Sequence, residues 1–151
     1  SNQKMKKDHT FQFTYKRYAG LNQLTAVEKE LIQRAMTEAE NAYAPYSGFH
    51  VGAAAIIERN KIVGASNMEN AAYPQCLCAE QVLCATVKSQ LQDRTIEKMA
   101  IYSPNWKEVI PLSPCGSCRQ ILLEKQRRQE KEMCIFMVNA SSEIWVVRVL
   151  C

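Results

Sequence analysis

The chain has 151 residues, of which 47% are hydrophobic and 23% are charged, and these values are typical of a single globular domain with a buried core. No apolar run approaches the roughly 18 residues of a membrane span and no secretory signal pattern occurs, so we expect a cytoplasmic protein with no membrane partner. The net charge of +4 arises in residues 1–20, which hold five basic side chains and one acidic side chain, while the rest of the chain carries 14 of each sign. Because a phosphate-binding protein is expected to carry its basic residues on the folded body, we predict no nucleic-acid partner.

Residues 1–23 are predicted to form an extension ahead of one domain at residues 24–151. Within the extension, residues 10–18 alternate apolar and polar side chains, which is typical of a β-strand. Three interpretations of this segment stay open. It is an additional strand at a sheet edge, a contact with another subunit, or a partly disordered segment.

The domain is predicted to contain three helices and five strands. Thr25 and Glu28 match a capping box that starts the first helix, and Pro45 disfavours helical geometry at the residue before it. A run of alternating charge at residues 124–132 predicts a solvated helix end. The other elements are strands at 51–57, 62–66, 99–103, 133–138 and 143–149, and helices at 77–91 and 116–128. This order predicts an α/β protein of three α/β/α layers with a mixed five-stranded sheet.

The cysteines favour a metal site. Seven is an odd number, and the chain is not a short secreted scaffold, so metal binding is favoured over disulfides. Cys78 stands two residues before Glu80, and 36 residues separate Cys78 from a Cys115-x-x-Cys118 motif. A catalytic zinc ion keeps three protein ligands and leaves the fourth position for water. Three thiols beside a carboxylate that is not a ligand therefore predict a hydrolytic zinc site.

Four segments, in this order, resemble the cytidine deaminase family of zinc-dependent enzymes. A lone C-x-x-C would equally fit a redox pair or half of a structural zinc site, but the resemblance extends from about residue 24 to residue 150. It implies the strand order 2-1-3-4-5 for the five strands and a compact homotetramer. The segments are YSGFHVGAA at 46–54, NMENAAYP at 67–74, CAE at 78–80 and SPCGSCRQ at 113–120.

The resemblance also implies a role for individual residues. One Zn²⁺ per chain would be held by Cys78, Cys115 and Cys118, and Glu80 would transfer protons during catalysis. Cys76 is interpreted as a thiol of the approach loop and not as a ligand. The residues implied in substrate binding are Phe49 against the pyrimidine, Asn67 and Glu69 at the ribose hydroxyl, Tyr73 toward the sugar of a neighbouring subunit, and the backbone of Ala79 facing the base.

The implied activity is hydrolytic deamination of cytidine and deoxycytidine to uridine and deoxyuridine in pyrimidine salvage. Two alternatives stay open at this point. The first is deamination of another aminopyrimidine nucleoside, such as blasticidin S. The second is a non-catalytic module that zinc stabilises, in which Glu80 would be dispensable and no nucleoside would turn over.

Overall fold

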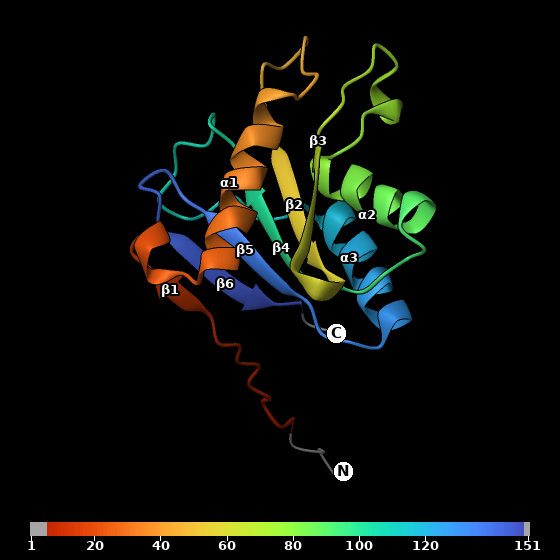
Figure 1. Cartoon of the computed structure of the whole chain (residues 1–151). Coiled ribbons are helices and arrows are strands. Elements are labelled where there is room, and N and C mark those ends of the chain that lie inside the picture. The colour runs from red at the N-terminus through yellow and green to blue at the C-terminus, as the bar shows by residue number, and fades with distance from the viewer. Residues whose placement is uncertain (1–5, 150–151) are drawn as a thin grey trace.

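A six-stranded mixed sheet separates helix α1 from helices α2 and α3 in the computed structural model, which describes residues 6–149 (Figure 1). Residues 1–5 of the predicted extension, and residues 150–151 with Cys151, lie outside the described residues. The strands are β1 (Lys16–Tyr18), β2 (Gly52–Ile57), β3 (Lys61–Ser66), β4 (Ile96–Tyr102), β5 (Cys134–Val138) and β6 (Ile144–Arg148). The helices are α1 (Ala26–Glu40), α2 (Ala79–Gln90) and α3 (Gly116–Gln129), with short 3₁₀ turns at Leu21–Gln23, Glu58–Asn60 and Tyr73–Gln75.

The strand order is β1-β6-β5-β4-β2-β3. Strands β4 and β5 are parallel and the other neighbours are antiparallel, so the predicted mixed sheet is confirmed. The five strands from β2 to β6 also follow the order that the resemblance implied. The predicted strand count of five was one too low, because β1 pairs with β6 and extends the sheet at that edge.

The sixth strand comes from the N-terminal segment. Of residues 10–18, only Lys16–Tyr18 forms a strand, which confirms the sheet-edge interpretation for those three residues. Two contacts on Trp145 of β6 hold the segment in place. The guanidinium of Arg17 lies 4.7 Å from the Trp145 ring centroid, and the ring of Tyr15 stacks on the same indole at 4.9 Å. An edge strand offers free backbone N–H and C=O groups, and β1 satisfies those of β6.

Helix α1 begins at the predicted capping box and packs closely on β2. Thr25 accepts a hydrogen bond from the Glu28 backbone, and the Glu28 side chain accepts one from the Thr25 backbone. The approach is so close at Gly52 that a Cβ there would lie 1.9 Å from the carbonyl oxygen of Ala35. Glycine at this position therefore lets the helix backbone rest directly on the strand.

Two hydrophobic cores lie on opposite faces of the sheet, as alternation along the strands requires. The α1 face buries the side chains of Leu31, Ile32, Ala54, Ile56, Ala100 and Phe136, among others. The face toward α2 and α3 buries Ala53, Ala55, Leu83, Val87, Met99, Ile101 and Leu122, among others. The predicted three layers are confirmed.

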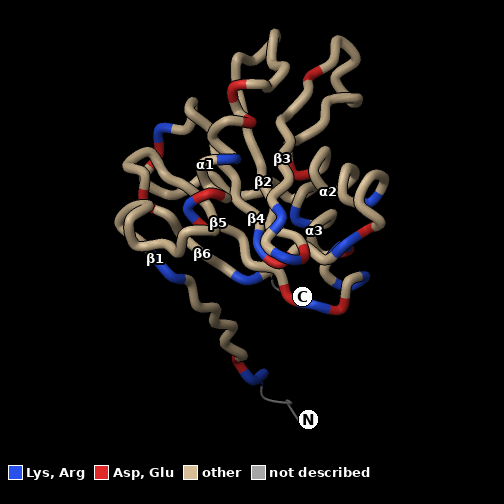
Figure 2. Tube along the Cα trace, viewed as in Figure 1, with Lys and Arg blue, Asp and Glu red and all other residues tan. Residues whose placement is uncertain are grey.

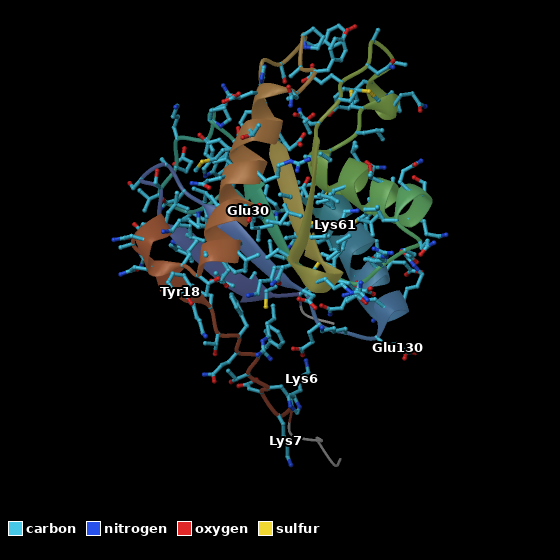
Figure 3. The ribbon with its side chains drawn as sticks, in the orientation of Figure 1. Lys6, Lys7, Tyr18, Glu30, Lys61 and Glu130 are labelled. Carbon is cyan, nitrogen blue, oxygen red and sulfur yellow. The ribbon has the colours of Figure 1, made fainter. Side chains whose placement is uncertain are left out.

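The predicted solvated end of α3 was only partly correct. Glu130 ends the helix in left-handed geometry and points away from the body (Figure 3). Lys125, in contrast, is 1% exposed. Its ammonium group donates to the carboxylate of Asp93 at 2.9 Å and to the backbone carbonyls of Asp93 at 3.0 Å and Arg94 at 2.8 Å. These acceptors follow the C-terminal end of α2, so the lysine fastens that end to α3.

Charged residues of both signs are interspersed along the backbone of the folded body (Figure 2). Lys98 and Glu28 form one such pair between β4 and α1, at 2.9 Å. None of the helices within residues 6–149 has the length and apolar character that crossing a membrane requires.

Candidate metal centre and its cavity

Helices α2 and α3 each begin at a cysteine. Cys78 is the N-cap of α2 and Cys115 is the N-cap of α3, and both have extended backbone geometry. Cys118 follows in the first turn of α3, where its N–H donates to the sulfur of Cys115 at 3.5 Å. Residues two apart do not share a helix face, but an N-cap residue lies outside the regular helix. This geometry lets Cys78 and Glu80 approach the same centre.

The sulfur atoms of Cys78, Cys115 and Cys118 all lie within 4.8 Å of one another. Three sulfurs bound to one tetrahedral zinc ion at about 2.3 Å would be roughly 3.8 Å apart, so small side-chain shifts are sufficient for binding. Thiolates are the soft donors that zinc favours, and helix N-termini stabilise negative sulfur. The cluster is compatible with one zinc ion, and three thiolate ligands would leave a fourth coordination position for water.

Hydrogen bonding and burial shift the acidity of the groups in this centre. A hydrogen bond shared with Cys118 lowers the pKa of the Cys78 thiol to about 7, and the same bond raises the pKa of Cys118. Glu80 is 5% exposed, and burial raises the pKa of its carboxyl group. Its Oε2 atom lies 3.6 Å from the sulfur of Cys118. A raised pKa brings a carboxyl group closer to the neutral pH at which it would exchange protons.

The metal centre lies in the wall of a cavity of about 740 Å³. This volume is within the range of small-molecule sites. All nine residues singled out in the sequence line it, which places the cysteines and Glu80 together with the residues expected to bind substrate. These are Cys78, Cys115, Cys118, Glu80, Phe49, Asn67, Glu69, Tyr73 and Ala79.

The five residues expected to bind substrate differ in their surroundings. Asn67 and Glu69 bond to the turn that carries Phe49: Asn67 to Phe49 and Val51, and Glu69 to residues 46 and 47. Tyr73 is 85% exposed, at the cavity rim. Ala79 is fully buried in the first turn of α2.

Sequence reasoning missed part of the cavity wall. Tyr46, Ser47 and Leu112 also line it. The first two belong to the same motif as Phe49, but Leu112 comes from an irregular loop and gave no signal beyond its apolar side chain. Cys76 lines the cavity as well, outside the three-thiol cluster. Its sulfur accepts a hydrogen bond from the Asn70 backbone at 3.3 Å, consistent with a loop position.

A family model and the sequences of known proteins place the chain in the same class of protein. Residues 25–134 match the family model of the cytidine and deoxycytidylate deaminase zinc-binding region. The cytidine deaminase of Halalkalibacterium halodurans is 35% identical over 94 residues, which are 62% of this chain and 68% of that protein. The cytidine deaminase of Sporosarcina psychrophila is 39% identical over 98 residues, which are 65% of this chain and 68% of that protein.

Solved structures that are similar to this chain belong to the same class of protein. The cytidine deaminase of Burkholderia pseudomallei superposes with a TM-score of 0.67 at 29% identity, covering 83% of this chain and 94% of that one. The enzyme of Mycobacterium tuberculosis gives 0.61 at 33% identity, covering 72% and 82%. Fold and metal centre together define a zinc-binding protein of the deaminase type. The chain belongs to the cytidine and deoxycytidylate deaminase family.

Proposed function

We propose that the chain catalyses the hydrolytic deamination of cytidine and deoxycytidine, with one zinc ion per chain. The main evidence is that three thiols and a buried carboxyl group lie together in the wall of one cavity large enough for a nucleoside. Relatives and a solved structure that are named cytidine deaminase support the choice of substrate.

The reaction adds water at C4 of the cytosine ring and releases the amino group as ammonia. Cys78, Cys115 and Cys118 would hold the zinc ion, which would supply a Lewis acid that lowers the pKa of water at that position. Glu80 would take up one proton of the attacking water and deliver it to ring nitrogen N3, and would then carry the proton of the new C4 hydroxyl group to the departing amine, leaving the C4 carbonyl of the product. Its contact with Cys118 supports this role, because it holds the carboxyl group beside the metal ligands.

The other cavity residues would orient the nucleoside. Phe49 would pack against the pyrimidine, and the buried first turn of α2 would present the backbone of Ala79 to the base. Glu69 and Tyr73 would face the sugar. Asn67 lines the same wall and would contact the ribose hydroxyl beside Glu69.

The test is turnover by the purified protein. A decrease in absorbance with cytidine and deoxycytidine, together with one equivalent of zinc per chain, supports the proposal. Glu80→Gln preserves side-chain size but removes the proton carrier, so we expect kcat to fall about 10²–10⁴-fold while zinc content stays unchanged. Near-normal kcat in this variant would instead favour a non-catalytic zinc module. Blasticidin S belongs in the substrate panel, since faster turnover of that nucleoside would overturn the choice of substrate.

We also propose a homotetramer in pyrimidine salvage, located in the cytoplasm. Exposed apolar side chains lie on the two loops beside the cavity. Tyr46 and Tyr73 line it, Tyr43 and Met68 form a backbone bridge between these loops, and the four side chains are between 46% and 85% exposed. A cluster of this kind is typical of surfaces that contact another chain. Light scattering on the purified protein would determine the assembly, and a monomeric mass would contradict it.

A further inference from the structure

The peptide unit between Phe49 and His50 is held by side chains from two other parts of the chain. Its carbonyl, on Phe49, accepts a hydrogen bond from Nδ2 of Asn67 at 2.9 Å. Its N–H, on His50, donates to Oδ1 of Asn105 at 2.8 Å. Asn67 follows β3 and Asn105 follows β4, so these two bonds join three loops. Both polar groups of one planar peptide are therefore bonded, which fixes the rotation of that plane.

This peptide influences where the Phe49 ring points. The turn that leads to it passes through Gly48, whose φ of +68° lies in the left-handed region that favours glycine. Residues 45–48 are exposed, and Phe49 and His50 are only half-buried, so burial alone does not hold the turn. A rotation of the Phe49–His50 plane would change ψ of Phe49 and with it the direction of the ring relative to β2.

The register of the sheet brings Asn105 to this peptide. Gly52, the first residue of β2, pairs with Tyr102, the last residue of β4. The turn that enters β2 and the loop that leaves β4 therefore lie at the same end of the sheet (Figure 1). His50 precedes this pair by two residues and Asn105 follows it by three, which places the amide within reach of the His50 N–H.

The loop that carries Asn105 is braced by its own hydrogen bonds. Ser103, at its start, is 5% exposed, and the Ser103 hydroxyl accepts from the Asn105 backbone N–H at 3.2 Å. Further along, the indole of Trp106 donates to the carbonyl of Ile110 at 2.8 Å. The same loop leads on to Cys115 at the start of α3. Asn105 therefore connects the turn of Phe49 to the segment that delivers two predicted zinc ligands.

We propose that Asn105 is a positioning residue, whose amide oxygen orients the Phe49–His50 peptide and thereby sets the Phe49 ring against the pyrimidine. This inference rests on the proposed function and goes beyond it. Asn105 lies outside the four segments that carry the family resemblance and, among residues 6–149, outside the cavity lining. An N–H only donates, so the oxygen of the amide has to face His50. The role therefore requires a hydrogen-bond acceptor at position 105.

Two substitutions at Asn105 test the need for an acceptor. Asn105→Ala removes it, and we expect kcat/KM for cytidine to fall about 10-fold, less than the roughly 10²-fold that a misplacement of 1 Å can cost. Asn105→Asp keeps an acceptor oxygen on a side chain of the same length, so kcat/KM should stay close to the wild-type value. Glu108→Ala changes an exposed side chain of the same loop and is the matched control. Equal losses in the alanine and aspartate variants, or no loss in the alanine variant, would overturn the proposal.

A double-mutant cycle with Phe49 tests whether Asn105 acts through that ring. Phe49→Ala removes the ring that Asn105 would position, so adding Asn105→Ala to this variant should cost no further kcat/KM. Losses from the two substitutions that multiply would mean that Asn105 acts by another route, and would refute the assignment.

Hydrogen exchange provides a readout that does not require activity. In Asn105→Ala the His50 N–H loses its acceptor, so exchange in the peptide covering residues 46–51 should accelerate, while Asn105→Asp and Glu108→Ala should match the wild type. Unchanged exchange in Asn105→Ala would refute the positioning role even if the wild type deaminates cytidine. Faster exchange in Asn105→Ala, with a wild type that does not turn over cytidine, would support the hold on the peptide and refute the proposed function.

Discussion

Removing the carboxylate of Asp93 should destabilise the fold strongly, because it leaves a buried ammonium group without its counter-charge. Lys125 is 1% exposed, and Asp93 is its carboxylate partner at 2.9 Å. Asp93 also accepts from Arg128 at 2.7 and 3.1 Å. In Asp93→Ala, Lys125 would retain two backbone carbonyls as acceptors but no negative charge.

The expected loss is about 3 kcal/mol in the free energy of unfolding. Breaking a buried ion pair by removing one partner commonly costs about 3–5 kcal/mol. We take the lower end because the two carbonyls remain and because the Asp93 side chain is 21% exposed. For a domain of this size the melting temperature should fall by roughly 6–12 °C. Urea denaturation measures the free energy, and the zinc content should not change, since the pair lies at the opposite end of α2 from Cys78.

The effect should depend on pH in a defined direction. Hydrogen bonds from Arg128 and Lys125 hold the pKa of Asp93 well below its usual range. A carboxyl group with a depressed folded pKa contributes stability that is complete above its unfolded pKa, about 3.9, and is lost as the pH falls through the folded value. The stability difference between wild type and Asp93→Ala should therefore be the same at pH 7 and pH 5 and smaller at pH 3.

An exposed ion pair provides the control for this prediction. Lys131 and Glu97 lie 3.1 Å apart with side chains 58% and 39% exposed, so Glu97→Ala should cost no more than about 1 kcal/mol. If Asp93→Ala were as mild as this control, the buried lysine would not depend on its carboxylate partner. A stability difference that grows toward pH 3 would refute the direction of the titration argument.

Two further predictions concern the metal centre and the packing of α1. Cys118→Ala should lose most bound zinc, whereas Cys84→Ala, a buried thiol outside the cluster, should retain it; metal analysis of both proteins decides, and zinc at full occupancy in the first would refute the ligand assignment. Gly52→Ala should destabilise the fold by about 1–3 kcal/mol or more, because its Cβ would meet the Ala35 carbonyl at 1.9 Å. Gly20→Ala, whose Cβ would lie 3.4 Å from its nearest neighbour, should unfold at the same urea concentration as wild type, and equal losses in both would contradict the close-packing argument.

Local chemistry made the zinc site predictable. Three thiols and a carboxyl group at these spacings are typical of a hydrolytic zinc site, and they lie in short motifs that can be recognised from neighbouring residues. Cys78 and Glu80 are two residues apart and cannot share one regular helix face, which agrees with the position of Cys78 at the N-cap of α2. The capping box at Thr25 is equally local, and so it too could be predicted from neighbouring residues.

The sequence therefore predicted the three-thiol cluster and the α/β class, and the family resemblance of its motifs implied the order of the five strands that follow α1. Long-range contacts decided the rest. Lys125 belongs to a run of charges that resembles a solvated surface, and only the packing of α3 against the end of α2 places acceptors around it. The edge strand β1 exists because β6 offers it an unpaired backbone. Asn67 is a polar loop residue in sequence. Its hydrogen bonds to Phe49 and Val51 form because the loop after β3 lies beside the loop between α1 and β2, and no local pattern encodes that contact.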